Sequence, residues 1–249
     1  MTYCVGLNMA DGLVMLSDTR TNAGFDNIAT FSKMHICEVP GERAICLLCA
    51  GNLATTQTVA NLLSEGIEVA GKVHTLSTVE TMFHAAELVG EAIRRVYHTD
   101  GPSMHDHNVS FDVTFLLGGQ IRGRKTALFE IYSAGNFIET TPDTPYLQIG
   151  EHKYGKPILD RTAKYDTELY DGVKLALVSM DSTLRSNLTV GLPIDLFVYR
   201  KDTFRVELRL RLTENDEYFK MLRERWSEAL REAYRAIPRP SWQPDTSGA

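Results

Sequence analysis

The second residue of the chain is a threonine, and its hydroxyl is a potential nucleophile. A threonine hydroxyl reacts poorly by itself, because its proton must pass to a nearby base. If Met1 is removed, Thr2 gains a free α-amine with a pKa of about 8, which is a suitable proton acceptor. The small side chain of Thr2 also favours removal of Met1. We therefore expect the chain to begin at a catalytic site, with no propeptide beyond Met1.

Two residues of opposite charge, Asp18 and Lys33, follow soon after Thr2. A cation beside a hydroxyl favours its ionised form, and a carboxylate beside a lysine makes a partly buried cation tolerable. Taken singly, Asp18 would be a turn former or an exposed ion pair, Lys33 a solvated strand residue and Thr2 a frayed terminus. Their combination favours a threonine nucleophile supported by a lysine–aspartate pair.

A hairpin is expected to bring these residues together. Residues 2–8 and 13–20 have the pattern of strands, and Asp11-Gly12 between them is a strong turn signal. With the turn centred there, the numbers of paired residues sum to roughly 23, which places Thr2 beside the stretch just after Asp18. A shift of one or two residues would place Thr2 opposite Asp18 or Thr19.

The remaining pattern predicts an α+β fold. Further strands are expected at 33–38, 43–49, 110–118, 126–138, 146–150, 194–200 and 204–212, and helices at 52–70, 77–98, 165–181 and 215–236. Ala50-Gly51-Asn52 ends a strand and opens the first helix, and Ser77 with Glu80 forms a capping box for the second. Several strands carry apolar residues on both faces. This predicts two antiparallel sheets flanked by helices, a four-layer α-β-β-α sandwich.

Length and composition set limits on the class of protein. The chain has 249 residues, of which 43% are hydrophobic, and a net charge of −6. We expect one domain over residues 1–237 and a disordered, proline-rich tail over 238–249. The sequence lacks a membrane-spanning run and a signal peptide. It also lacks a basic stripe, which argues against nucleic acid as a partner.

The cysteines and histidines predict neither a metal site nor a cofactor. Cys4, Cys37, Cys46 and Cys49 lie in apolar, strand-like surroundings, which favours buried thiols in a reducing cytoplasm. Met104-His105-Asp106-His107 has ligand types but no third ligand at a recognisable distance, so a solvated loop is the better interpretation.

The helix expected at 215–236 has an apolar stripe. The stripe consists of Phe219, Leu222, Trp226, Leu230 and Ala233. It could pack on its own domain or dock on a neighbouring subunit, and the sequence favours neither.

Together these residues resemble a proteasome-type β subunit. The resemblance is carried by Thr2 on a leading strand, Ser17-Asp18-Thr19-Arg20 after one hairpin, Lys33, and Gly51 at a strand-to-helix break. Such subunits belong to the N-terminal-nucleophile hydrolases and form self-compartmentalising assemblies. The opening TYCVGL and the uninterrupted block from Ser17 to His35 are most similar to a bacterial branch of that family. The likeness covers nearly the whole chain and is strongest over residues 2–53.

The resemblance implies a role for each of these residues. Thr2 Oγ would attack the scissile carbonyl, and Lys33 would lower the cost of the developing alkoxide. Asp18 would hold Lys33 in position, and the Gly51 N–H would point into the oxyanion hole.

The later part of the chain departs from the family pattern. A Gly-Ser-Gly is expected near the site, but here Glu151 stands where the serine is expected. An Asp and a Ser normally follow a helix and support the threonine amine, and here Ser186 and Thr189 take their places. The carboxylate that orients the amine is therefore missing, or Glu151 or Asp181 supplies it.

The sequence thus predicts a threonine peptidase that cleaves amide bonds in peptides or unfolded proteins through an acyl ester on Thr2. The resemblance implies a homo-oligomer, either a ring or an open helical stack, and leaves open whether an unfolding ATPase feeds it. Two alternatives remain: a small-molecule amidohydrolase of the same fold, and a catalytically silent scaffold subunit.

Overall fold

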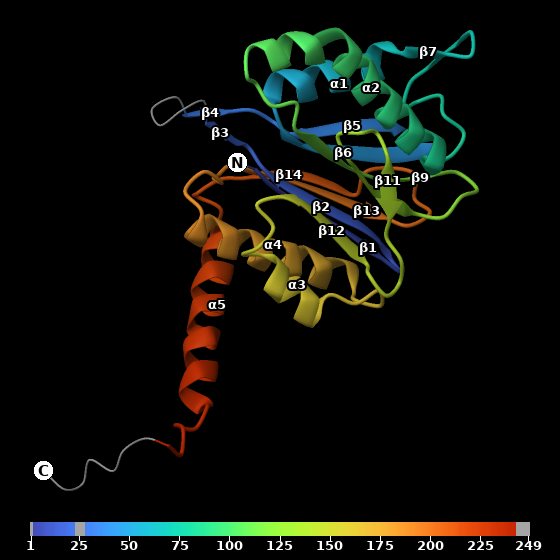
Figure 1. Cartoon of the computed structure of the whole chain (residues 1–249). Helices are drawn as coiled ribbons and strands as arrows, with labels where there is room; N and C mark the ends of the chain where they lie inside the picture. Colours follow the sequence, from blue (N-terminus) through green and yellow to red (C-terminus); the bar gives the residue numbers. More distant parts are fainter. Residues whose placement is uncertain (1, 23–27, 243–249) are drawn as a thin grey trace, which may run out of the picture.

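The computed structural model describes residues 2–22 and 28–242, and two antiparallel sheets packed face to face form its centre (Figure 1). The first sheet has the order β12 (Tyr146–Gly150), β1 (Tyr3–Met9), β2 (Gly12–Asp18), β13 (Ile194–Arg200) and β14 (Leu208–Leu212). The second has the order β11 (Phe137–Glu139), β10 (Ala127–Ile131), β9 (Val113–Ile121), β6 (Arg43–Gly51) and β5 (Met34–Val39). The predicted pair of antiparallel sheets is confirmed.

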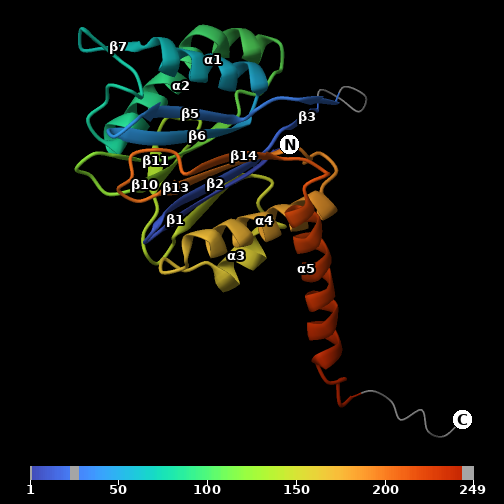
Figure 2. The same ribbon diagram turned by 180° about the vertical axis from the view of Figure 1, so that it is seen from behind.

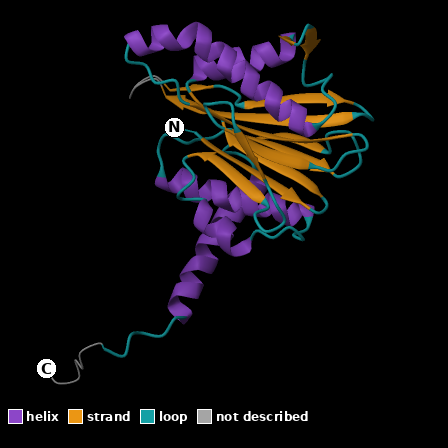
Figure 3. Cartoon of the chain, turned by 45° about the vertical axis from the view of Figure 1, so that its right-hand side comes forward, coloured by secondary structure: helices purple, strands orange, loops and turns teal. Residues whose placement is uncertain are grey.

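Helices cover both outer faces of this pair of sheets (Figures 2 and 3). The second sheet is covered by α1 (Leu53–Glu65) and α2 (Met82–Asp106), and the first by α3 (Lys156–Thr162) and α4 (Leu169–Ser186). The C-terminal helix α5 (Glu217–Ala236) leaves α4 and projects away from the body. The fold is therefore the predicted four-layer α+β sandwich.

Three apolar layers hold the sandwich together, because successive side chains of a strand point to opposite faces. In β2, Leu13 and Met15 belong to the cluster between the sheets, whereas Val14 and Leu16 belong to the cluster under α3 and α4. A third cluster lies between the second sheet and the helices α1 and α2. Burial on both faces explains why these strands are apolar without alternation.

The N-terminal hairpin turns one residue earlier than predicted. Met9 pairs with Gly12 and Cys4 with Ser17, so the turn is Ala10-Asp11 and not Asp11-Gly12. Gly12 belongs to the ladder because β13 runs close beside it: a Cβ there would lie 2.0 Å from the Tyr199 carbonyl oxygen. Extending this register by two residues places Thr2 opposite Thr19, one of the shifts allowed from the sequence.

The second helix begins and ends later than predicted. Its N-cap is Thr81, whose hydroxyl accepts from the His84 N–H at 3.0 Å, so the Ser77–Glu80 capping box was wrong. The helix continues through Pro102, at the cost of one missing N–H donor, to Asp106. The stretch from Met104 to Asp106 thus lies in its last turn and not in a loop.

Five smaller elements were not predicted, and one predicted strand is divided in two. The first helix ends at Glu65, because Gly66 turns the chain at φ 111° into a hairpin of β7 (Ile67–Val69) and β8 (Lys72–His74). Helix α3 starts with a proline in its first turn. The short strands β3 (Arg20–Asn22) and β4 (Ile28–Thr30) pair with each other, and the strand expected over 126–138 is two strands, β10 and β11.

Helix α5 is divided into two halves. Phe219 and Leu222 are buried in the core under α4, and the Arg223 Nε donates to Asp181 Oδ1 at 2.6 Å. Farther along, Leu230 is 50% exposed, and Tyr234 is exposed as well. Packing on its own domain is thus confirmed for the first half, and the distal half of the stripe remains uncovered in a single chain. Of the predicted tail, residues 243–249 lie outside the described residues.

Two general features follow from the described residues. Each helix there is too short or too polar to cross a membrane. Nowhere in residues 2–22 and 28–242 do three His, Cys, Asp or Glu side chains gather as a metal site would require.

Candidate active site

Thr2 lies at the start of β1, held between β2 and β12. Its carbonyl oxygen accepts from the Glu151 N–H at 2.7 Å, and the next N–H, that of Tyr3, donates to Asp18 Oδ1 at 3.1 Å. Thr2 is 9% exposed. Gly150 is required beside it, because its φ is +79° and a Cβ there would lie 2.0 Å from the Thr2 oxygen. These contacts fix the backbone of Thr2 on both sides.

Asp18 and Lys33 form a buried ion pair, with Lys33 Nζ 2.6 Å from Asp18 Oδ1. Asp18 is fully buried and Lys33 is 4% exposed. The second carboxylate oxygen accepts from the Gly191 N–H at 3.2 Å. Burial raises the pKa of Asp18, and the Lys33 ammonium acts in the opposite direction. The Asp18 carboxylate therefore accepts from Lys33, from the Tyr3 N–H and from the Gly191 N–H, which hold it in place.

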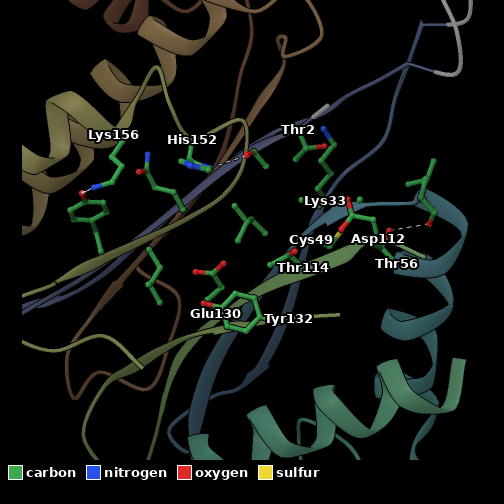
Figure 4. Close-up of a pocket in the computed structure, with 18 of the residues that line it drawn as sticks. Thr2, Lys33, Cys49, Thr56, Asp112, Thr114, Glu130, Tyr132, His152 and Lys156 are labelled. Carbon is green, nitrogen blue, oxygen red and sulfur yellow. Dashed lines mark hydrogen bonds between the residues drawn. The ribbon is translucent and has the colours of Figure 1, made fainter. Parts of the chain in front are cut away.

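The Lys33 ammonium group has one donor to spare among the described residues. A lysine ammonium has three N–H donors. One goes to Asp18 Oδ1, and a second goes to the Arg20 carbonyl oxygen at 2.7 Å. The side chain ends beside Thr2 (Figure 4). The third N–H can therefore stabilise negative charge on the threonine oxygen.

Gly51 is the last residue of β6 and carries an open N–H. The Cys49 N–H donates to the Lys33 carbonyl oxygen at 3.0 Å. N–H groups two residues apart on a strand point to the same side, so the Gly51 N–H also points to the β5 side of β6, beyond Met34 where β5 begins. Gly51 has a φ of +113°, and a Cβ there would lie 2.0 Å from the Asp112 carbonyl oxygen. Only glycine fits this position, and its N–H faces the region of Thr2.

A cleft of about 810 Å³ lies between the ends of the two sheets. Thr2, Lys33 and Gly51 line one part of it. Asp112, Glu130, Tyr132 and His152 are among the residues that line the rest (Figure 4). A volume of this size holds a drug-sized ligand or a short peptide segment. Three of the predicted site residues therefore border one cavity, and Asp18 lies behind this lining, paired with Lys33.

Cys49 also lines the cleft, but it is a poor competing nucleophile. Burial raises the pKa of its thiol to about 11. The reactive thiolate is therefore scarce at neutral pH. All four cysteines are free in the structure.

The residues that could support the Thr2 amine include one that the sequence did not suggest. Glu151 is 6% exposed, and its Oε2 accepts from Asn187 Nδ2 at 2.9 Å. Asn187 Oδ1 in turn accepts from the Thr189 hydroxyl at 2.6 Å. Asn187 directly follows α4, and its position at the helix end was the available signal. The predicted positions Glu151 and Thr189 thus meet through Asn187.

Two other candidate positions lie elsewhere. Ser186 is the last residue of α4 and is exposed. The Asp181 carboxylate is fully buried at the junction of α4 and α5, bound to Arg185 at 3.0 Å and to Arg223 at 2.6 Å. Its two oxygens are therefore bound by one arginine of α4 and one of α5, and not by Thr2.

Two stacked antiparallel sheets lie between helix layers, and Thr2 lines the cleft at the ends of the sheets. This is the fold of N-terminal-nucleophile hydrolases. The proteasome subunit family matches residues 2–198. The chain belongs to this family, as the residue pattern predicted.

Solved structures of bacterial Anbu proteins are similar to this chain over nearly its whole length. A mutant Anbu from Hyphomicrobium sp. strain MC1 is 50% identical with a TM-score of 0.88, covering 96% of this chain and 99% of that one. Anbu from Yersinia bercovieri, described as an ancestral beta-subunit, is 47% identical with a TM-score of 0.89, covering 97% and 100%. Anbu from Pseudomonas aeruginosa, described as a helical assembly, is 47% identical with a TM-score of 0.89, covering 98% and 99%.

Anbu is thus the bacterial branch to which the opening TYCVGL pointed. A search of curated proteins gives no match.

Proposed function

We propose that this chain is a threonine-type peptidase whose nucleophile is Thr2, freed by removal of Met1. The observation that carries the proposal is the buried Lys33–Asp18 pair, whose ammonium ends beside Thr2 with one donor to spare. A buried pair of this kind is costly unless well partnered. Met1 itself lies outside the described residues, so its removal is part of the proposal.

Acylation uses the hydroxyl and the amine of the same residue. The Thr2 Oγ attacks the carbonyl carbon of a substrate amide while its proton passes to the Thr2 α-amine. The Gly51 N–H and the Lys33 ammonium stabilise the developing negative charges. The C–N bond then breaks, the amine returns the proton to the leaving nitrogen, and an ester remains on Thr2.

Deacylation repeats these steps with water. Water attacks the ester carbonyl, its proton passes to the α-amine, and the C–O bond breaks to release the acid and restore the Thr2 hydroxyl. In this scheme Glu151, Asn187 and Thr189 orient the amine, a role that the family pattern gives to a serine and an aspartate. Glu151 is the carboxylate best placed for this, because its backbone N–H already binds the Thr2 carbonyl.

Two alternatives have some support. A small-molecule amidohydrolase would use the same Thr2 chemistry in a cleft of about 810 Å³. A silent scaffold subunit is favoured by the departures at Glu151 and Ser186 from the family pattern.

The first test is covalent labelling of the purified protein. A peptide epoxyketone or β-lactone is expected to add one equivalent to Thr2, in a protein whose intact mass lacks one methionine. Thr2→Ala should remain unlabelled, and Thr2→Cys should be alkylated by the same probes. Peptide mapping identifies the labelled residue. A retained Met1 together with no adduct would support the scaffold alternative and contradict the proposed peptidase.

We further propose that the protein is a cytoplasmic homo-oligomer in which the distal half of α5 contacts a neighbouring subunit. The amphipathic stripe continues past the residues buried in the chain's own core to Leu230, which is exposed. The similar protein from Pseudomonas aeruginosa is described as a helical assembly. The free thiols suit a reducing compartment.

Replacing Leu230 and Tyr234 together by Gln is expected to lower the molar mass measured by light scattering, because it removes apolar contact area at the interface. The matched control replaces Glu228 and Glu232 by Gln on the other side of α5. If both variants keep the mass of the wild type, the distal half of α5 does not hold the assembly together.

A further inference from the structure

Glu130 places a carboxylate on a face that is otherwise part of the apolar core. Its neighbour Leu128 belongs to the cluster between the sheets, whereas Phe129 and Ile131 belong to the cluster under α1 and α2. Alternation therefore turns Glu130 to the space between the sheets. Its cross-strand partner Leu116 also belongs to the inter-sheet cluster. At Glu130 the apolar core gives way to the cleft.

The Glu130 carboxylate differs from the other shielded carboxylates of the sandwich. Asp18 is paired with Lys33, Glu151 with Lys153, and Asp195 with Arg211. For Glu130, no hydrogen bond or ion pair is formed within residues 2–22 and 28–242. Burial raises its pKa, and only the charge of His152 acts in the opposite direction. A half-buried carboxylate without a partner costs free energy that a bound cation would offset.

The lysines that border the same cleft are paired with other carboxylates, and Arg20 is bound to a backbone oxygen. Lys33 is bound to Asp18, and Lys156 lies 2.6 Å from Asp160. Arg20 donates to the Leu188 carbonyl oxygen at 2.8 Å. Asp112 adds a second acidic side chain to the lining. Among the described residues, no lysine or arginine forms an ion pair with Glu130 or Asp112.

The surroundings of Glu130 suit a long side chain with a cationic end. Glu130 and Tyr132 lie on the wall opposite Thr2, with His152 above Glu130 (Figure 4). The tyrosine ring offers both an apolar surface for methylene groups and a face for a cation. One ligand can therefore reach Thr2 and Glu130 together, because both line the same cavity.

We propose that Glu130 is a specificity-determining residue that binds a lysine or arginine side chain of the peptide whose amide bond lies at Thr2. This rests on the proposed peptidase function for the identity of the scissile bond. The selected substrates would be peptides with a basic residue close to the cleavage point.

The test measures binding and not turnover. In the Thr2→Ala protein, fluorescence anisotropy is measured with labelled hexapeptides in which one position at a time is lysine, norleucine or glutamate. Norleucine matches the lysine stem without its charge. At one position, lysine is expected to bind about tenfold more tightly than norleucine, as for a buried hydrogen bond to a charged group. Adding Glu130→Gln should remove that difference.

The matched control is Glu139→Gln on the neighbouring strand β11, where the carboxylate is paired with Lys125 outside the cleft. It should leave the lysine preference intact. Equal binding of lysine and norleucine at every position, a preference that survives Glu130→Gln, or no binding by any peptide would overturn the proposal.

The two proposals fail in different ways. Suppose that the lysine preference depends on Glu130 but the wild-type protein never forms an adduct on Thr2. The chain then has a binding site for basic peptides, and the proposed peptidase activity is contradicted. An adduct on Thr2 without any lysine preference would contradict only the proposed role of Glu130.

Discussion

Replacing Lys33 by Ala is expected to slow covalent labelling of Thr2 by a factor of about 10² to 10⁴. Without the ammonium, the threonine oxygen loses the cation that ends beside it and would stabilise its negative charge. The rate constant for adduct formation with a peptide epoxyketone, followed by intact-mass spectrometry, measures this effect.

The same substitution is also expected to destabilise the fold. It leaves the fully buried Asp18 carboxyl group without its cation. Removing one partner of a buried pair costs about 3–5 kcal/mol. Urea unfolding of Lys33→Ala would measure this loss of stability. A less stable protein would by itself give less labelled protein.

A second variant separates catalysis from stability. Combining Asp18→Asn with Lys33→Met removes both charges, and the amide oxygen of the introduced asparagine can still accept from the Tyr3 N–H. This double variant should recover most of the unfolding free energy lost in Lys33→Ala, yet stay as slow to label. If it labels at the rate of the wild type, the ammonium has no role at Thr2.

Replacing Gly51 by Ala is expected to lower the labelling rate of Thr2 by a factor of about 10² to 10³, the usual effect of losing one oxyanion donor. A Cβ at this position would lie 2.0 Å from the Asp112 carbonyl oxygen, and the φ of +113° is strained for alanine. The strand end must therefore move, and the Gly51 N–H moves with it. Labelling kinetics and a thermal melt together measure the two consequences.

Gly71→Ala is the matched control for Gly51→Ala. Gly71 has a φ of +80° in the turn between β7 and β8, and an added Cβ there meets nothing within 4 Å. It should show the backbone strain alone, with labelling of Thr2 unchanged. Equal labelling by the Gly51→Ala and wild-type proteins would mean that the Gly51 N–H is not part of an oxyanion hole.

The amino-acid sequence was sufficient for the fold class and for the first group of site residues. Thr2 and Asp18 are joined by one tight hairpin, and Lys33 directly precedes a strand, so local signals were enough to bring them together. Placing the turn at Asp11-Gly12 gave the wrong register, but the prediction that Thr2 and Asp18 lie together was unaffected, because both are at the same end of the sheet. The apolar patterns of the strands similarly predicted buried layers on both faces, which is what a sandwich requires.

Other features arise only when the layers pack together. Asn187 meets Glu151 because α4 ends beside β12, and Gly191 binds Asp18 across most of the chain. Glu130 faces the cleft because of its register against β9 and the place where the two sheets part. Such contacts depend on which strands pair and how the layers stack, and no local pattern of residue types encodes them. The grouping of Thr2, Asp18 and Lys33 could therefore be predicted from the sequence, whereas the contacts around Glu151 and the lining of the cleft could not.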